Sequence, residues 1–571
     1  MDEDYLKKEI RKFALKNSIE HEGKANEKAI IGSVMGAIPE ARENPQMVAS
    51  LTQDSIVDIN KLPLDEQEKE LKETAPELTE KKETKKKEGL KPLPNAEKGR
   101  VIMRIAPSPS GPMHIGHAMT YGVSSEYCRM YNGKLILRIE DTNPDNIYVP
   151  AYEMLEDEAQ WLTGNNVKEV IVQSERLPLY YDYVEKFIDK SAAYVCTCDP
   201  EEYKQKLNRQ EACQCRELPA ERQRKRWEKM LSNEGYKPGD AVVRLKTDIN
   251  HKNPAMRDFP LARINEAEHP RQGRKFRVWP LMNLSVFVDD IESGMTHVIR
   301  GKDHADNAKR QEIMYNYLGK EAPATLFQGR VNFEDIRLSC SKTKKLIEEG
   351  EYTGWDDIRL AFLAALRRRG YQSQALVRWA TDIGTSLTDK TVSKDEVFKT
   401  INAHNRDILE PDAKRFYFVD QPVKIKVEGA PSQEVELDLH PDNIKGGRKF
   451  RTNENFIVTK HDYEKMAQGR ISRLMDCLNY VHESERIAFD SLEYEKYKEK
   501  GCCRIIHWLP DDDEQVVDAE VSMPDGTITN GKAEKTIEML KAGDVIQFER
   551  FGFCRLDSVE DGCYKFWFCH K

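Results

Sequence analysis

The stretch "VIMRIAPSPSGPMHIGHAMTYGVSSEYCRMYNGKLILRIED", residues 101–141, decides the fold of the largest part of this chain. The apolar run at 101–106 predicts a buried strand, residues 111–131 predict a turn that enters a helix, and residues 134–141 predict a second strand. A strand, a helix and a strand within about 40 residues predict a βαβ unit, and therefore a parallel sheet with a right-handed crossover. A further strand at 295–303 and a helix at 307–318 extend the same pattern.

The turn between the first strand and the helix has the composition of a phosphate-binding site. Pro107 and Pro109 stiffen it, and Gly111 lets the backbone approach a ligand. His114 and His117 are three residues apart, so they share one face at the start of the helix, where free amide groups favour phosphate. Two imidazoles there can stabilise the charge that develops on a phosphoryl group. The alternative, that each histidine caps or packs the helix, would be favoured for an isolated pair; the whole string after a strand favours nucleotide chemistry.

The bulk composition is that of a soluble multidomain protein. With 571 residues the chain is too long for a single core. No stretch approaches the roughly 18 apolar residues that a membrane span requires, and the acidic start "MDEDYLKKEI" lacks the order of a secretory signal. We therefore expect a cytoplasmic protein whose 12 cysteines are reduced thiols or metal ligands.

The formal net charge of −9 argues against nucleic acid as a partner, but one face of a large chain can still be basic. Three basic clusters are present: "ERQRKRWEK" from residue 221, "LRRRG" from residue 366 and "IKGGRKFR" from residue 444. Each by itself is more typical of a solvated face than of a phosphate groove.

Two pairs of cysteines have the spacing of a metal site. "CTC" (Cys196 and Cys198) is followed by "CQC" (Cys213 and Cys215). Four thiolates suit tetrahedral Zn²⁺, and they leave no open position for a reactant, so the predicted site is structural. Cys-x-Cys is less usual than Cys-x-x-Cys, and buried free thiols are the alternative.

Several separated blocks resemble the class I aminoacyl-tRNA synthetases, in the form of the glutamyl and glutaminyl branch. "RIAPSPSGPMHIGH" (104–117) resembles the first signature of the class, "RIEDTNP" (138–144) follows at the spacing of this branch, and "GWDDIRL" (354–360) is similar to a third block. The similarity runs from about residue 101 to the carboxyl terminus. Short β-rich runs after residue 411, among them "VIQFERFGFCRL", resemble the archaeal and eukaryotic type, whose anticodon-binding part is a β-barrel.

The resemblance implies a multidomain α/β and β fold with a Rossmann-like catalytic domain. Two further segments are predicted from the residues themselves, an amino-terminal helical unit at 1–62 and a charged linker at 63–99 that is at most partly helical. The expected order after the linker is as follows: the first half of the catalytic domain at 100–192, an inserted domain that grips the tRNA acceptor end and carries the cysteines at 193–278, the second half at 279–350, a helical connector at 351–412, and β-barrel anticodon-binding domains at 413–571.

The family pattern assigns an amino-acid site to Arg104, Ser108, Glu140 and Arg300. Glu140 would bind the substrate ammonium group, and two arginines would match two carboxylates. The glutaminyl pattern has a cysteine in place of Arg300, and an arginine facing a neutral amide would lose its hydration without gaining a partner. The resemblance therefore implies glutamate. Met282 departs from the pattern, because many relatives have a tyrosine there.

The resemblance also implies an ATP site with Mg²⁺. The lysine-rich second signature of the class corresponds to "LSCSKTKK" (338–345), with Ser339 on the family serine and Cys340 where the key lysine often lies. We expect Lys342 to substitute for that lysine and to act in catalysis with His114 and His117; the alternative is a polar loop with surface lysines. The expected ATP-binding residues are Pro109, Gly111, His114, Gly116, His117, Ser339 and Lys342.

The implied activity is ATP-dependent formation of an aminoacyl-adenylate from L-glutamate, followed by transfer to the 3′-terminal adenosine of tRNA(Glu), with tRNA(Gln) as a second acceptor in some relatives. A glutaminyl enzyme is the nearer alternative, and a tRNA-binding or regulatory protein without catalysis is the more distant one. Two of the basic clusters, from residues 221 and 444, then become candidate phosphate contacts. A monomer or weak dimer is the expected oligomeric state.

Overall fold

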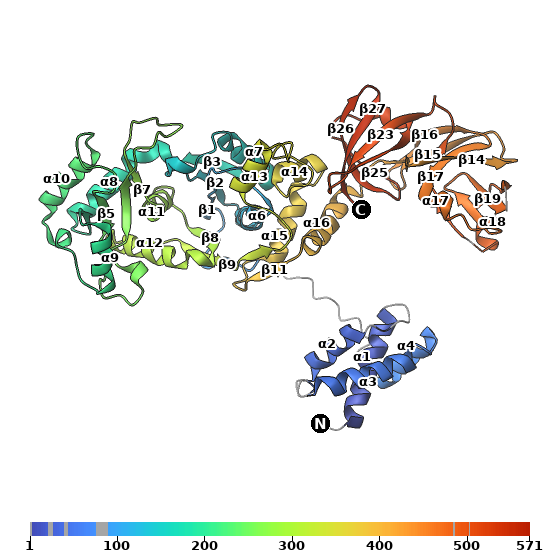
Figure 1. Ribbon diagram of the computed structural model, residues 1–571, viewed down its shortest axis with the longest axis horizontal. Coiled ribbons are helices and arrows are strands. Elements are labelled where there is room, and N and C mark those ends of the chain that lie inside the picture. Colours follow the sequence, from blue (N-terminus) through green and yellow to red (C-terminus); the bar gives the residue numbers. More distant parts are fainter. Residues whose placement is uncertain are drawn as a thin grey trace. The chain divides into compact units, whose positions relative to one another are not determined.

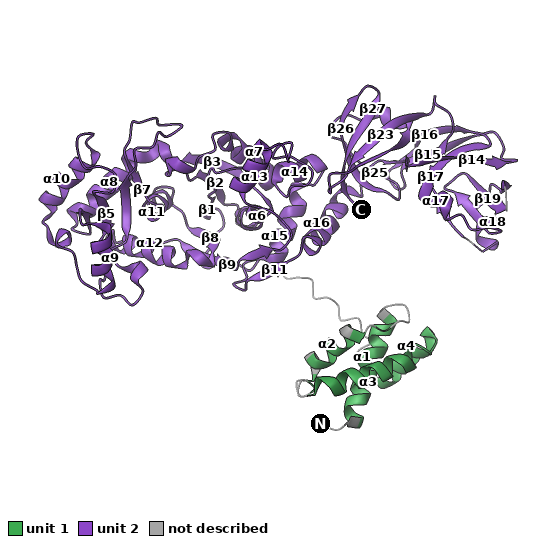
Figure 2. Ribbon diagram, in the orientation of Figure 1, with its two compact units in different colours: residues 1–88 green, residues 89–571 purple. Residues whose placement is uncertain are grey.

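The computed structural model describes residues 3–20, 25, 27–38, 41, 44–75, 89–483, 486–501 and 503–571. The chain forms two compact units, Met1–Glu88 and Gly89–Lys571 (Figures 1 and 2). Each unit has its own hydrophobic core. No helix within the described ranges is long and apolar enough to cross a membrane.

The first unit is helical in its described part, with α1 (Glu3–Glu20), α2 (Glu27–Ala37), α3 (Pro45–Ile59) and α4 (Leu64–Thr74). Helix α4 lies inside the stretch expected to be a linker. Its Leu71 is buried, and Gln67 donates hydrogen bonds to the carbonyl oxygens of Ile59 and Leu62 at 3.0 and 2.9 Å. The helical unit therefore continues past residue 62, because two inward-facing residues are enough to dock a polar helix. Residues 76–88 of the expected linker lie outside the described residues.

The second unit begins with the parallel sheet that the sequence predicts. Strands β1 (Ile102–Ile105), β2 (Lys134–Ile139) and β3 (Val167–Val172) pair in parallel and are connected by α6 (Ile115–Met130) and α7 (Ala151–Thr163). Strands β8 (His297–Gly301) and β9 (Ala324–Gln328) form a second parallel pair. Thr296 joins the pairs: its N–H donates to the Ile102 carbonyl at 3.0 Å, and its Oγ1 accepts from the Ile102 N–H at 2.9 Å. The strand order thus reverses beside β1, where open α/β sheets form ligand crevices at their carboxyl ends.

An antiparallel sheet interrupts this domain between β3 and β8. Strands β4 (Ala193–Cys196), β5 (Val242–Leu245), β6 (Pro260–Ile264) and β7 (Val278–Pro280) are neighbours in that order. The helices around it are α8 (Leu177–Asp189), α9 (Pro200–Asn208), α10 (Ala220–Leu231), α11 (Met282–Glu292) and α12 (Ala305–Tyr317).

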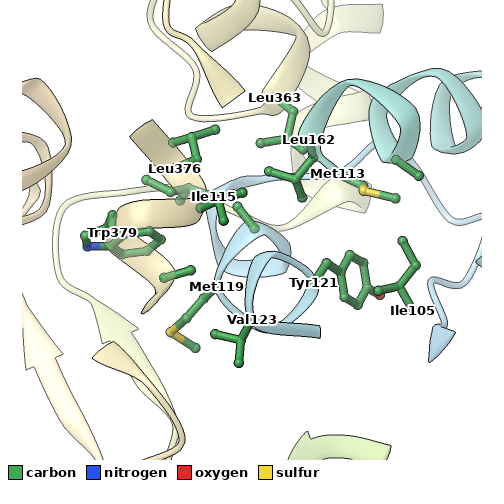
Figure 3. Close-up of a cluster of buried hydrophobic side chains, with 14 of the residues drawn as sticks. Ile105, Met113, Ile115, Met119, Tyr121, Val123, Leu162, Leu363, Leu376 and Trp379 are labelled. Carbon is green, nitrogen blue, oxygen red and sulfur yellow. The ribbon is translucent and has the colours of Figure 1, made fainter. Parts of the chain in front are cut away.

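The connector packs directly on the first motif helix. The range 351–412 contains α14 (Leu363–Arg369), α15 (Ser373–Ile383), β11 (Lys390–Val392) and α16 (Lys394–Leu409), and it is preceded by β10 (Val331–Phe333) and α13 (Cys340–Glu348). Figure 3 shows Met113 and Ile115 among Leu162, Leu363 and Leu376, so the motif shares one core with the connector. A Cβ at Gly122 of α6 would lie 3.2 Å from the Ala380 Cβ, so this glycine lets α15 approach closely.

The basic cluster "LRRRG" connects α14 to α7 and to the carboxyl-terminal region. Arg367 pairs with Asp157 at 2.8 Å, and Arg368 pairs with Asp557 of the carboxyl-terminal region at 2.6 Å. Arg369 is buried and donates to the carbonyl oxygen of Cys569 at 2.8 Å. The interpretation of this cluster as a solvated face is therefore wrong for Arg368 and Arg369, which bond to the carboxyl-terminal region, whereas Arg367 is exposed.

In its described part, the carboxyl-terminal region has two large β-sheets, a separate two-stranded hairpin and two main cores, as the sequence predicts for β-barrel domains. Arg448 of the cluster "IKGGRKFR" is buried and pairs with Glu534 at 2.7 Å and Glu549 at 3.1 Å, so the prediction of a phosphate contact is wrong for this residue. In the described part of the chain, the strands of the first sheet are, in spatial order, β12 (Arg415–Phe416), β25 (Val545–Phe548), β26 (Gly552–Glu560), β27 (Cys563–His570), β23 (Val516–Ser522), β24 (Ile528–Glu534) and β13 (Phe418–Asp420). Those of the second are β21 (Ile505–Ile506), β18 (Ile471–Leu474), β19 (Leu478–Glu483), β20 (Arg486–Ser491), β14 (Pro422–Glu428), β17 (Asn455–Thr459) and β22 (Leu509–Pro510), with β15 (Gln433–His440) and β16 (Ile444–Thr452) as a hairpin.

Candidate active site

The two motif histidines cap helix α6 and remain able to donate a hydrogen bond. The Nδ1 atom of His114 accepts from the Gly116 N–H, and the Nδ1 atom of His117 accepts from the His114 N–H, each at 3.1 Å. An imidazole that accepts at Nδ1 carries its proton on Nε2. The capping role therefore does not compete with a catalytic one; it fixes the tautomer that donates from Nε2.

Burial keeps both imidazoles neutral. It lowers the pKa of His114 to about 2, with His117 as a second cause, and it lowers the pKa of His117 to about 4. Their ring centroids are 3.9 Å apart, so two charged rings would repel strongly. At neutral pH the pair therefore offers uncharged N–H donors.

The backbone around His114 is held by the connector and by a buried carboxylate. The Leu363 N–H donates to the Met113 carbonyl at 2.9 Å, and the Ile115 N–H donates to the Ala361 carbonyl at 3.0 Å. Glu158 of α7 accepts from the Met113 N–H at 2.6 Å. These bonds fix the turn on both sides of the histidine.

Glu158 has an expected effect on stability. Burial raises the pKa of its carboxyl from 4.5 to about 8, against the opposing Met113 hydrogen bond. Between these two values the folded chain holds a proton that the unfolded chain has lost, so stability decreases as pH rises from about 5 to 8. Glu158→Gln removes the ionisation, and we expect its unfolding free energy relative to that of the parent to increase over this pH range. Denaturant unfolding at pH 5.5 and pH 8.5 measures the difference; an equal difference at both values would contradict the assignment.

A cavity of about 230 Å³ lies beside His117 at the carboxyl ends of β1 and β8. It brings together three predicted substrate residues, Arg104, Glu140 and Arg300, although Arg300 is far from the other two in the sequence. Met282 also lines it, as its place in the family pattern implies. The remaining lining residues are Ala106, Gly116, Thr120, Tyr121, Val286, Ile299, Gly301, His304 and Gln311.

The guanidinium of Arg300 is only partly satisfied. Its Nη1 donates to the Gln311 Oε1 at 2.9 Å, whereas its buried Nε has no hydrogen-bond partner among the described residues. Burial lowers its pKa to about 10, and the nearby Arg104 adds to this effect. A buried cation with free donors is prepared to receive an anion.

Asp290 and Arg138, which the sequence reasoning did not select, complete the site, and Asp289 lies next to it on the same helix. Asp290 of α11 lies 2.5 Å from the Arg138 Nη1 and 3.3 Å from the Arg104 Nε. Arg138 in turn donates to Glu140 at 2.8 Å, and Asp289 accepts from Arg176 at 2.8 Å. The available signal was "VFVDD", in which two adjacent acids end an otherwise apolar helix segment.

Four predicted residues of the motif turn do not line this cavity: Ser108, Pro109, Gly111 and His114. Ser108 is exposed. Gly111 is buried against Cys340, since a Cβ at this glycine would lie 2.8 Å from the Cys340 Cβ. The roles of these residues in substrate binding stay predictions.

The stretch "LSCSKTKK" starts helix α13 against the motif turn. Ser339 is its N-cap and accepts from the Lys342 N–H at 3.5 Å. The thiol of Cys340 lies 3.7 Å from the Pro112 carbonyl, so this residue docks the helix start. Lys342 is exposed, whereas Lys344 pairs with Glu348 at 3.7 Å.

The four predicted cysteines come together at one point. Their sulfur atoms all lie within 4.8 Å of one another, and the Cys196–Cys213 and Cys198–Cys215 pairs are each 3.9 Å apart. A tetrahedron with Zn–S bonds of about 2.3 Å has edges of about 3.8 Å. The Thr197 N–H also points to the Cys215 sulfur at 3.5 Å, as expected beside a thiolate. The residues present therefore fit Zn²⁺.

We expect about one Zn²⁺ per chain by elemental analysis of purified protein. Cys213→Ser should lower the zinc content and the melting temperature together, because the metal ties β4 to the following loop. Cys477→Ser, at a buried thiol outside this cluster, is the matched control and should keep the zinc. Metal-free parent protein with an unchanged melting temperature would exclude the site.

Family models match most of the second unit, and curated relatives match nearly the whole chain. The family model of the catalytic domain of "tRNA synthetases class I (E and Q)" matches residues 100–411, and two models of the anti-codon binding domain of the same class match residues 413–495 and 505–557. The chain is 43% identical to a glutamate–tRNA ligase of Thermococcus kodakarensis, over 98% of this chain and 99% of the relative. It is 44% identical to that of Pyrococcus abyssi (96% and 97%) and 42% identical to that of Methanothermobacter thermautotrophicus (98% and 99%).

Proposed function

Because the chain belongs to the class I tRNA synthetases of the glutamyl and glutaminyl branch and is a glutamate–tRNA ligase, we propose that its cavity beside His117 binds L-glutamate next to ATP. The ligase joins glutamate to tRNA at the expense of ATP. In the proposed order of steps, the α-carboxylate of glutamate attacks the α-phosphate of ATP and pyrophosphate leaves. A ribose hydroxyl of the terminal adenosine of the tRNA then takes the acyl group from the adenylate, and AMP leaves. This order needs no covalent enzyme nucleophile, only positioning and charge stabilisation.

The charge of the cavity supports glutamate over glutamine. Arg104, Arg138 and Arg300 bring three positive charges, and Glu140 and Asp290 bring two negative ones. Asp289 is left out of this balance because it pairs with Arg176. One positive charge remains, which matches the single net negative charge of glutamate; glutamine is neutral. The unsatisfied guanidinium of Arg300 is the observation that carries this proposal.

Within the cavity we assign the substrate ammonium to Glu140 and the two carboxylates to Arg104 and Arg300. The second oxygen of Glu140 supports this, because the Arg138 contacts use only its Oε1. Arg138 thereby fixes the Glu140 carboxylate in place while leaving an acceptor for an ammonium group.

For ATP, the uncharged Nε2–H groups of His114 and His117 are suited to the phosphoryl oxygens. They stay neutral at working pH and therefore do not attract a free anion strongly before the reaction. The exposed Lys342, one helical turn from the docked Cys340, is the proposed partner of the leaving pyrophosphate, and Mg²⁺ accompanies ATP.

The tRNA contacts are proposed from exposed basic residues. In α10, Arg222 is exposed, whereas Arg224 and Lys225 are engaged with Asp189 and Glu221. In β16, Lys449 is exposed beside the buried Arg448. We propose tRNA(Glu) as the acceptor, with tRNA(Gln) as a second one, Zn²⁺ at the four cysteines, and the cytoplasm as the compartment.

Charging of purified tRNA(Glu) and tRNA(Gln) in separate reactions tests the proposal. We expect attachment of glutamate to tRNA(Glu) and no attachment of glutamine to either tRNA. Pyrophosphate exchange with glutamine and none with glutamate would favour a glutaminyl enzyme. Absence of exchange with both amino acids, in protein that still binds tRNA, would favour the non-catalytic alternative.

A further inference from the structure

Helix α11 places two aspartates side by side beneath the amino-acid cavity, and they differ in what they contact. Asp289 is fully buried and bonds to Gln173, Arg176 and Tyr180, at 2.8, 2.8 and 3.0 Å, and it reaches the Arg138 Nε only at 4.0 Å. Asp290 is 2% exposed and lies close to the arginines of the site. Successive helical residues point about 100° apart, so the two adjacent carboxylates make their short contacts with different partners.

Among the described residues, Asp290 is the one carboxylate within ion-pair range of all three arginines, Arg104, Arg138 and Arg300. Its Oδ1 lies 2.5 Å from the Arg138 Nη1 and 3.3 Å from the Arg104 Nε, and its Oδ2 lies 3.8 Å from the Arg300 Nη2. Asp290 itself does not line the cavity. It therefore acts on a substrate only through the arginines above it.

Asp290 is closer to Arg138 and Arg104 than to Arg300. Asp290 closely neutralises Arg138 and holds Arg104, but it reaches Arg300 only at the edge of ion-pair range. Arg300 is otherwise held by the neutral amide of Gln311. The unbalanced charge of the cavity thus lies at Arg300, and the other two guanidinium groups are fixed before a substrate enters.

We propose that Asp290 is the positioning residue for specificity: its single negative charge holds three mutually repelling arginines together and leaves one unit of positive charge, at Arg300, for an amino acid with one net negative charge. The inference rests on the proposed binding of glutamate at this cavity. Without the carboxylate the cavity would carry two unbalanced charges, its arginines would spread apart, and small anions would occupy it.

The variant Asp290→Asn tests the proposed role of Asp290. The variant Asp289→Asn, at the neighbouring aspartate, is the matched control. The change at Asp290 preserves size and removes the charge, and we expect the KM for glutamate to rise about 30-fold in tRNA-supported pyrophosphate exchange, with the KM for ATP within about twofold of the parent value. Chloride, substituted for gluconate at constant ionic strength, should become a competitive inhibitor toward glutamate. Asp289→Asn removes an equally buried charge from the same helix; it should lower the melting temperature, leave the KM for glutamate within about threefold, and create no chloride competition.

The variant Arg300→Gln, assayed in parallel, tests glutamate binding at the cavity separately from the positioning role of Asp290. If it leaves the KM for glutamate unchanged, the cavity is not the glutamate site and the proposed function of the site fails with it. If it raises that KM while Asp290→Asn behaves like Asp289→Asn, only the role of Asp290 is overturned. Should Asp290→Asn not fold, Asp290→Glu keeps the charge on a longer side chain: a raised KM for glutamate without chloride competition supports the charge role, and chloride competition overturns it.

Discussion

Replacing Arg300 with glutamine is expected to lower kcat/KM for glutamate about 1000-fold. The substitution takes away the buried cation whose Nε has no partner among the described residues, so a substrate carboxylate would be desolvated against a neutral amide. Leaving a buried charge unpaired in this way costs about 3–5 kcal/mol. The steady-state rate of glutamate attachment to tRNA(Glu) over a range of glutamate concentrations gives the value.

Two further measurements make the Arg300 result specific. Arg300→Lys keeps the charge without the fork of donors, and we expect partial recovery of kcat/KM. Because Arg300→Gln makes the cavity neutral, the preference for glutamate over glutamine should shrink as well. A variant that keeps kcat/KM within about threefold of the parent value would contradict the assignment of a substrate carboxylate to Arg300.

Replacing His114 with asparagine is expected to lower kcat of pyrophosphate exchange about 100-fold with little loss of stability. Asparagine is a good N-cap, so its Oδ1 can replace the Nδ1 acceptor for the Gly116 N–H. The shorter side chain cannot place a donor where the Nε2–H lies, and one well-aimed donor is worth about 3 kcal/mol in such a transition state. The kinetics of pyrophosphate exchange report on the catalytic role of His114, and a thermal melt of the same preparation reports on its role as the cap of helix α6.

His297→Asn is the matched control for this experiment. His297 is also a buried histidine of the catalytic sheet, but it bonds to Thr296 and to the Pro94 carbonyl, away from the cavity. It should lower the melting temperature and leave kcat near the parent value. If both variants lost activity only in proportion to their loss of stability, His114 would be a capping residue alone.

Much of the fold and half of the site could be predicted from local sequence. The βαβ unit, the β-rich carboxyl-terminal part and the cluster of four cysteines depend on period and spacing along the chain, which single segments carry. The same is true of His114 and His117, whose shared face follows from helical geometry. Lys342 and Ser108 were selected by family position, and their roles remain predictions.

What the sequence determined, then, is the content of the segments: a glycine- and histidine-containing turn after a strand, two cysteine pairs with the spacing of a metal site, and the motifs of the family. What only the tertiary structure decided is how charges are distributed among segments. The basic string at 366–370 became a joint to the carboxyl-terminal sheets, and Asp290 became the shared counterion of three arginines from three strands. The physical reason is that period and spacing are properties of one segment, whereas an ion pair depends on which side chains packing brings within about 4 Å. Arg104 and Arg138 are each more than 150 residues from Asp290 in the chain.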